Sequence, residues 1–101
     1  MPPKNAFTFH RAEKRISMEI PVVLDGHVQT PGSEATFTEN VSARGARVIS
    51  VRHWEKGEPL VLASRTGEFR SAARVAYCQP LRGEGYAVGV EFLAPKGRWV
   101  V

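Results

Sequence analysis

The chain has 101 residues, 43% of them hydrophobic, and a formal net charge of +4 at pH 7. This length supports a single domain with one core, and the composition excludes a disordered or collagen-like chain. No apolar run is long enough to span a membrane, and the N-terminus lacks the apolar core of a signal peptide. The single cysteine cannot form an internal disulfide, whereas small secreted domains usually contain several. We therefore expect a cytoplasmic protein without membrane insertion.

Arginine makes up ten of the fourteen basic residues. Because its side chain presents a planar fork of donors that matches phosphates and carboxylates, this bias favours an anionic partner. The arginines are spread from Arg11 to Arg98, however, and do not form the single basic patch that is typical of nucleic-acid-binding proteins. Charge alone therefore does not predict binding to RNA or DNA.

Residues 1–15 are predicted to form a mobile N-terminal arm. Residues 1–9 contain two prolines and show no clear period, although Phe7 and Phe9 could attach the arm to the rest of the domain. Residues 10–15 could form a helical turn, in which Arg11 and Arg15, four residues apart, would lie on the same side.

The first predicted strand covers residues 16–24, where apolar side chains recur at every second position. Pro21 lies inside this pattern, and proline has no backbone N–H to donate to a neighbouring strand. We therefore expect the strand to lie at an edge of the sheet or to carry a bulge at Pro21.

Five further strands are predicted, at residues 34–41, 46–51, 59–63, 69–78 and 86–92, separated by turns that contain glycine and proline. Trp54, in the polar loop after the third strand, is expected to cover one end of the core. Six short strands without a strong helical segment indicate an antiparallel barrel or sandwich. We favour a closed barrel over residues 16–93, followed by a tail at residues 94–101, because closure removes exposed strand edges.

The end of the second strand presents polar side chains next to a turn. Alternation along the strand would place Thr36, Thr38, Asn40 and Ser42 on one polar face, opposite Ala35, Phe37 and Val41. Asn40 and Ser42 would then project side by side. Gly45 suits the following turn because glycine can adopt positive φ, and its missing side chain would let a ligand approach. Taken alone, these residues favour an ordinary polar hairpin turn, because asparagine, serine and glycine are common in turns for local reasons.

Catalytic and metal-binding patterns are absent from the sequence. The histidines, His10, His27 and His53, are far apart and have none of the spacings typical of metal sites. Cys78 lies on a predicted strand with no feature that would activate its thiol, and no glycine-rich phosphate loop joins a strand to a helix. We therefore interpret the chain as a non-catalytic binding module without a metal or cofactor.

Two short motifs carry the functional signal: Arg11-x-x-x-Arg15 directly before the first strand, and Asn40-x-Ser42-x-x-Gly45 after the second. Together, on an all-β chain of this length, they resemble the PilZ domain family, which binds the bacterial second messenger cyclic di-GMP through an RxxxR motif and a D/N-x-S-x-x-G motif. Residues 45–48, 73–78 and 86–92 also resemble the third and the last two strands of that family. The resemblance implies a six-stranded antiparallel β-barrel, here with little or no C-terminal helix.

The resemblance also implies a role for each motif residue. Arg11 and Arg15 would bind phosphate through forked hydrogen bonds and would contact guanine. Asn40 would bind a guanine edge, Ser42 would hydrogen-bond guanine or phosphate, and Gly45 would leave room for the ligand. Binding would draw the arm down over the barrel and so present a new surface to an unidentified downstream protein.

Three positions leave details of the implied site open. Asn40 stands where many members have aspartate, which could change guanine recognition. His10 stands where many members carry another arginine that could help to hold a second ligand molecule, so the stoichiometry is open. Arg44, inside the second motif, could contact phosphate or be solvated, and we favour solvation.

Two alternative functions are also considered. The first is a PilZ-like protein-interaction domain that binds no nucleotide, although the intact motifs argue against it, because non-binding members typically lose the arginines. The second is a small basic barrel that binds RNA or DNA, which would need an aromatic stacking platform on one sheet face. The aromatic residues of the predicted strands fall on the apolar faces, so we do not expect a nucleic-acid partner.

Overall fold

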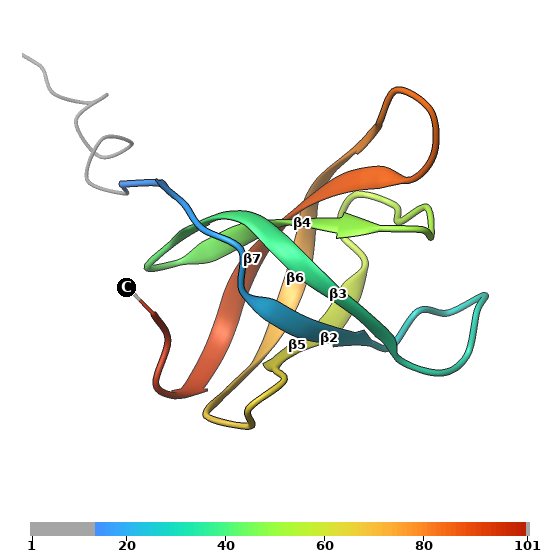
Figure 1. The fold of residues 1–101 in the computed structure, drawn as a ribbon. Helices are drawn as coiled ribbons and strands as arrows, with labels where there is room; N and C mark the ends of the chain where they lie inside the picture. The colour runs from blue at the N-terminus through green and yellow to red at the C-terminus, as the bar shows by residue number, and fades with distance from the viewer. Residues whose placement is uncertain (1–13, 101) are drawn as a thin grey trace, which may run out of the picture.

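Seven antiparallel strands make up the described part of the computed structural model, residues 14–100, which contains no helix (Figure 1). They are β1 (Ile16–Ser17), β2 (Pro21–Asp25), β3 (Glu34–Ser42), β4 (Gly45–Ser50), β5 (Pro59–Ser64), β6 (Phe69–Pro80) and β7 (Tyr86–Gly97). Over these residues, accordingly, no helix is long and apolar enough to cross a membrane.

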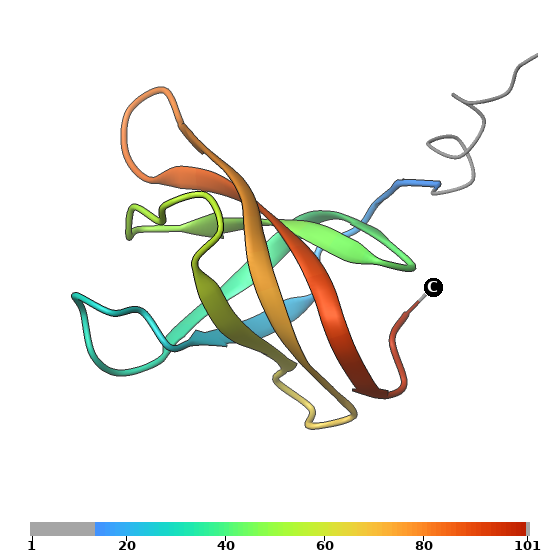
Figure 2. The ribbon, with the colours of Figure 1, turned by 180° about the vertical axis from the view of Figure 1, so that it is seen from behind.

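Six of the strands close into a barrel. The sheet runs in the order β1-β3-β2-β5-β6-β7-β4, and β4 pairs again with β3, so that β2 to β7 form a complete ring. β1 is an additional short strand on β3. β6 and β7 form a long hairpin, seen from behind in Figure 2, in which β7 continues past the predicted strand end at Phe92 to Gly97. The predicted six-stranded antiparallel barrel is confirmed.

The first predicted strand is divided just before Pro21. β1 and β2 both pair with β3, and residues 18–20 lie between them outside the ladder. The side chain of Thr38, on β3, fills the gap: its hydroxyl donates to the carbonyl oxygen of Met18 at 2.6 Å and accepts from the backbone N–H of Ile20 at 2.9 Å. The expected irregularity at Pro21 is therefore present, and a buried threonine satisfies the backbone groups that it leaves unpaired.

The predicted division of the second strand into a polar and an apolar face is wrong. Thr38 is fully buried, whereas Phe37 points outward with 44% of its surface exposed. The pairing of β3 with β4 shifts its register between Thr38 and Asn40, so the alternation is interrupted and Val41 and Ser42 are both buried. A bulge of this kind moves every following side chain to the other face, and simple alternation cannot anticipate it.

The core is formed by inward side chains from all six barrel strands. These are Val22, Leu24, Val41, Ala46, Val48, Leu60, Leu62, Phe69, Ala73, Val75, Val88, Val90 and Phe92, joined by Trp54 from the loop between β4 and β5. The indole N–H of Trp54 donates to the Ser50 hydroxyl at 3.2 Å, which in turn donates to the buried carboxylate of Glu34 at 2.7 Å. Trp54 is fully buried at this end of the barrel, as expected for a residue that covers the core.

His27 closes the same end through the loop between β2 and β3. Its Nδ1 accepts hydrogen bonds from the backbone N–H groups of Gln29 and Thr30, at 3.2 and 3.1 Å. The ring proton must then lie on Nε2, which donates to the carbonyl oxygen of His53 at 2.8 Å. The ring also packs edge-on against Trp54, with centroids 4.5 Å apart. His27 is therefore a structural residue, in agreement with the absence of a metal-binding spacing.

Replacing Thr38 with valine should destabilise the barrel, because the change keeps the shape of the side chain but leaves the Met18 carbonyl and the Ile20 amide without a partner. A buried polar group that loses its partner costs about 1–3 kcal/mol. We expect the free energy of unfolding, measured by urea denaturation, to fall by roughly that amount. Thr30→Val, at an exposed position, should leave it unchanged. Equal stability of the two variants would show that the bridge is dispensable.

Candidate ligand-binding site

The two motif segments lie side by side at the end of the β3–β4 hairpin. β1 pairs with the last residues of β3, with Ser17 opposite Asn40. Arg15, which directly precedes β1, is therefore carried to the same surface, and Figure 1 shows the start of the described chain, in blue, crossing this hairpin. Arg15 Nη1 donates a hydrogen bond to Asn40 Oδ1 at 3.0 Å. One residue of each motif is thus in contact, although 25 positions separate them in the sequence.

The contact leaves the charge of Arg15 available to a ligand. Arg15 is exposed, and Asn40 is a neutral amide, so their hydrogen bond does not neutralise the guanidinium. The arginine also keeps other N–H donors for a second partner. Arg11 and His10 lie outside the described residues, as does most of the predicted arm, so their part in the site stays a prediction.

Ser42 holds the turn between β3 and β4. Its side chain is fully buried, accepts a hydrogen bond from the Arg44 backbone N–H at 3.3 Å and donates to the Gly45 carbonyl at 3.4 Å. Its own carbonyl accepts the indole N–H of Trp99 at 2.9 Å. The hydroxyl therefore shapes the turn that contains the second motif, and its predicted contact with nucleotide stays a prediction. Arg44 is exposed at the tip of the turn.

Gly45 does not adopt the positive φ that the sequence predicted. It is the first residue of β4, pairs with Glu91 of β7, and is buried. A Cβ atom at this position would lie 2.2 Å from the carbonyl oxygen of Val90. The requirement for glycine therefore arises from the close approach of β7, and not from the backbone conformation of the turn. The prediction that Gly45 also leaves room for a ligand stays a prediction.

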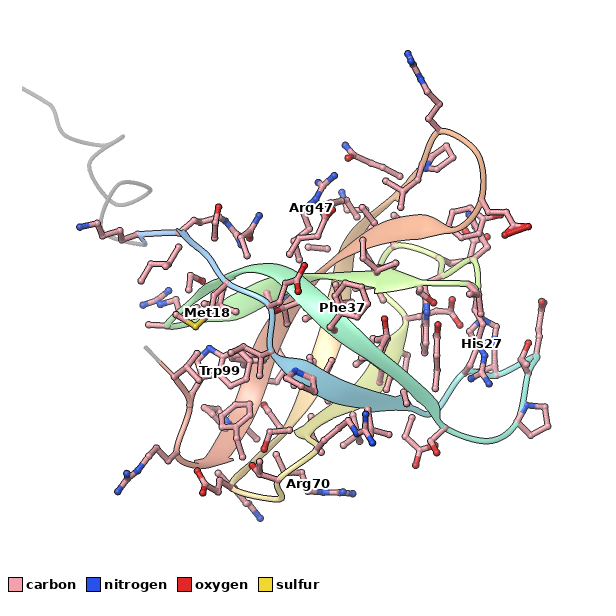
Figure 3. The ribbon with its side chains drawn as sticks, viewed as in Figure 1. Met18, His27, Phe37, Arg47, Arg70 and Trp99 are labelled. Carbon is pink, nitrogen blue, oxygen red and sulfur yellow. The ribbon has the colours of Figure 1, made fainter. Side chains whose placement is uncertain are left out.

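A polar cluster next to Asn40 was missed by the sequence reasoning. Arg47, opposite Asn40 in the ladder, donates from Nε to Glu39 Oε1 at 2.8 Å, and from Nη1 to the Tyr77 hydroxyl at 3.1 Å and to Gln79 Oε1 at 3.2 Å. Figure 3 shows Arg47 on the outer surface of the barrel. The hydrogen bond to Glu39, followed by that to Tyr77, raises the pKa of Arg47 above its usual value.

Backbone register explains how residues from four strands meet in this cluster. Asn40 lies opposite Arg47, Arg47 opposite Gly89, and Gly89 opposite Tyr77, which forms one row across β3, β4, β7 and β6. A Cβ atom on Gly89 would lie 2.1 Å from the Tyr77 ring, so the glycine provides the space in which the ring reaches toward Arg47. The ring centroid is 5.7 Å from the Arg47 guanidinium carbon. The candidate site is therefore continuous with an ordered polar row on the barrel surface.

Comparison with known proteins identifies the family. A family model for the PilZ domain matches residues 9–98. The chain belongs to the PilZ domain family. The matched region contains both motifs and the preceding His10, and it covers all seven strands. PilZ domains are a family of cyclic di-GMP receptors, and they are generally non-catalytic, which agrees with the interpretation of the sequence as a binding module.

The barrel of this PilZ domain is also similar to a solved structure, that of the inhibitor of motility of Bacillus subtilis (MotI/DgrA). The TM-score is 0.64 at 20% sequence identity, and the match covers 80% of this chain and 41% of that protein. The present chain therefore spans less than half the length of that protein, and the likeness concerns the fold. No curated protein matches the sequence. In residues 14–100, no group of three or more metal-binding side chains is present.

Gly45→Ala should destabilise this PilZ domain, because the new methyl group would meet the Val90 carbonyl oxygen. Forcing an extra methyl group into a packed site typically costs about 1–3 kcal/mol, and we expect a loss of that order in the free energy of unfolding. Ala43→Ser, at an exposed position in the same turn, is the control and should be neutral. Full stability of Gly45→Ala would contradict the packing explanation for this glycine.

Proposed function

We propose that the chain is a non-catalytic receptor that binds cyclic di-GMP through Arg11, Arg15, Asn40, Ser42 and Gly45. The observation that carries this proposal is the 3.0 Å hydrogen bond between Arg15 Nη1 and Asn40 Oδ1, which joins the two family motifs on the surface of the barrel. Membership of the PilZ domain family supports the same ligand class.

The chemistry of the two motifs suits a cyclic dinucleotide. The ligand carries two phosphates and two guanines, so a site needs cationic donors and groups that match base edges. Arg15 is exposed and not neutralised by Asn40, and its guanidinium can bind phosphate in a forked, charge-assisted arrangement. The amide group of Asn40 both donates and accepts hydrogen bonds, as guanine recognition requires.

Arg47 supports binding by neutralising Glu39. The Glu39 carboxylate directly precedes Asn40 and would repel the ligand phosphates if it were unpaired. Its hydrogen-bonded ion pair with Arg47, at 2.8 Å, removes most of that repulsion. Arg47 is therefore a positioning residue of the proposed site, and it acts through Glu39 and Tyr77 rather than through the ligand.

Binding through Arg11 and Arg15 would fix the segment before β1 against the barrel. Arg15 is attached directly to β1, and β1 lies against β3, so a ligand held between this segment and the turn at residues 40–45 would bridge the two. We propose that the resulting surface is recognised by a downstream protein, which makes the domain a ligand-dependent adaptor.

A nucleotide-independent interaction domain is the second candidate function. The observation that favours it is the complete burial of Ser42, whose hydroxyl is engaged within the turn in this conformation. Binding of RNA or DNA has less support. The exposed ring of Phe37 corrects the prediction that strand aromatics all point inward, but one exposed ring is not the series of aromatic side chains that stacks successive bases.

Arg15→Ala should weaken cyclic di-GMP binding by about tenfold or more, because a hydrogen bond to a charged group contributes about 1.5–3 kcal/mol. Isothermal titration calorimetry of the full chain measures this directly, and the wild-type titration also gives the number of ligands per chain. Arg82→Ala, at an exposed position in the β6–β7 hairpin, is the matched control and should bind like the wild type. Equal affinities of Arg15→Ala and Arg82→Ala would remove Arg15 from the site.

Arg47→Ala should weaken cyclic di-GMP binding several-fold, because it exposes the Glu39 carboxylate, and a like charge near the ligand phosphates costs about 1 kcal/mol at a solvated surface. The double variant Glu39→Gln/Arg47→Ala removes both charges and should recover most of the affinity. If the double variant binds as weakly as Arg47→Ala alone, the loss does not come from Glu39, and the positioning role of Arg47 is wrong.

A further inference from the structure

A small groove opens at the end of the barrel that carries the β5–β6 hairpin. Its volume is about 190 Å³, and its walls come from the segment before β2, from that hairpin and from the residues after β7. Ile20, Pro21, Trp99 and Val100 provide apolar surface, and Arg65, Glu68 and Arg98 are its charged lining residues. Figure 3 shows Trp99 on the side of the barrel that also carries Met18. The groove is separate from the polar row of Arg47 and Tyr77.

The main wall of the groove is held rigidly. The indole of Trp99 packs against Phe69 and Phe92, with ring centroids 4.6 and 5.1 Å away, and its N–H donates to the Ser42 carbonyl. The backbone N–H of Arg98 donates to the carbonyl oxygen of Glu68 at 2.7 Å, which fixes the chain just before the indole. Trp99 is therefore a fixed wall and not a side chain that could fold into the groove and fill it.

The surface around the groove carries unpaired positive charge. Four exposed cations, Arg65, Arg70, Lys96 and Arg98, lie on the hairpin and on the end of β7, and none of them forms an ion pair within residues 14–100. Two carboxylates oppose this charge: Glu68 lines the groove itself, and Glu19 directly precedes Ile20. The four cations exceed them, so the surface keeps a net positive charge.

The positions of Arg70 and Lys96 reduce the stability of the isolated domain. Arg70 and Lys96 are direct partners in the β6–β7 ladder, and like charges directly opposite each other destabilise a sheet. By contrast, Arg74 and Glu91, further along the same ladder, form a salt bridge of 2.7 Å. The repulsion at Arg70 and Lys96 would be relieved by an acidic partner.

We propose that this groove docks an acidic segment of a partner protein, which inserts one apolar side chain between Trp99 and Ile20 and places carboxylates against Arg65 and Arg98. The volume suits a single side chain. A membrane is disfavoured because Pro21 and Val100 are the only exposed apolar residues that line the groove, whereas bilayer binding needs a broad apolar face. A nucleic acid is disfavoured because the indole is already packed against two phenylalanine rings and cannot serve as an open stacking platform.

The test is a selection of random twelve-residue peptides displayed on phage against the full chain, without nucleotide, so that its outcome does not depend on cyclic di-GMP binding. We expect the selected peptides to share one large apolar residue flanked by aspartate or glutamate. Synthetic copies should bind at least tenfold more weakly to Arg65→Glu/Arg98→Glu. The control Lys56→Glu/Arg82→Glu changes the net charge equally at exposed positions outside the groove, and it should bind like the wild type.

Two further measurements distinguish a loss of peptide binding from a loss of folding in the variants. Circular dichroism checks that both double variants are folded, and the affinity of the wild-type chain for the peptides should fall as sodium chloride is raised. The proposal is overturned if no peptide is selected, if the selected peptides show no acidic enrichment, or if charge reversal leaves their affinity unchanged.

Other occupants would give distinct results, each of which contradicts the proposal. A selected consensus that matches Ala6-Phe-Thr-Phe9 would assign the groove to the protein's own N-terminal segment. Concentration-dependent dimerisation in light scattering, lost in Arg65→Glu/Arg98→Glu, would assign it to a second copy of the chain. Binding of anionic phospholipid vesicles or of an oligonucleotide that is lost in the same variant, without peptide binding, would assign it to those ligands.

Discussion

Two hydrogen bonds of the Thr38 hydroxyl are the contacts that bring the two motifs of the candidate site together. The hydroxyl bonds the Met18 carbonyl and the Ile20 amide in the gap between β1 and β2, where the ladder with β3 is interrupted. The interruption lets both short strands lie on β3, and β1 then reaches the last residues of that strand. Arg15 meets Asn40 only because β1 is held there. A backbone irregularity, stabilised by one buried hydroxyl, thus joins two motifs that are remote in sequence.

Much of the fold was predictable from residue patterns because strand alternation and turn residues are local signals. The barrel, its six strands and the irregularity at Pro21 followed from them. The face assignment of β3 failed because the bulge between Thr38 and Asn40, in the pairing with β4, places Phe37 and Val41 on opposite faces of the strand. Alternation along a single strand does not report such a bulge. Thr38 was placed on a polar outer face, whereas its burial reflects unpaired backbone groups of residues 18–20. The residues around Thr38 in the sequence do not indicate that backbone groups of another segment lack hydrogen-bond partners.

The motif residues of the site were predictable from the family pattern, but their surroundings were not. Gly45 was expected to serve a turn, whereas the structure shows that it admits the Val90 carbonyl oxygen. The cluster of Arg47, Tyr77 and Gly89 arises from register across three strands, which a single sequence does not reveal. The sequence indicated this cluster only through polar residues at outward positions of neighbouring strands. Such residues are common on any solvated sheet face, so the signal was too weak to predict this cluster.

The central claim is that Arg15 and the turn at residues 40–45 form one binding site, and nuclear magnetic resonance of the ¹⁵N-labelled chain titrated with cyclic di-GMP tests it most directly. The account predicts that the largest shifts fall on the backbone amides of residues 10–17 and 40–45 and on the side-chain amide of Asn40, whose oxygen accepts the Arg15 hydrogen bond. An unchanged spectrum at saturating ligand, or shifts confined to other strands, would contradict the account.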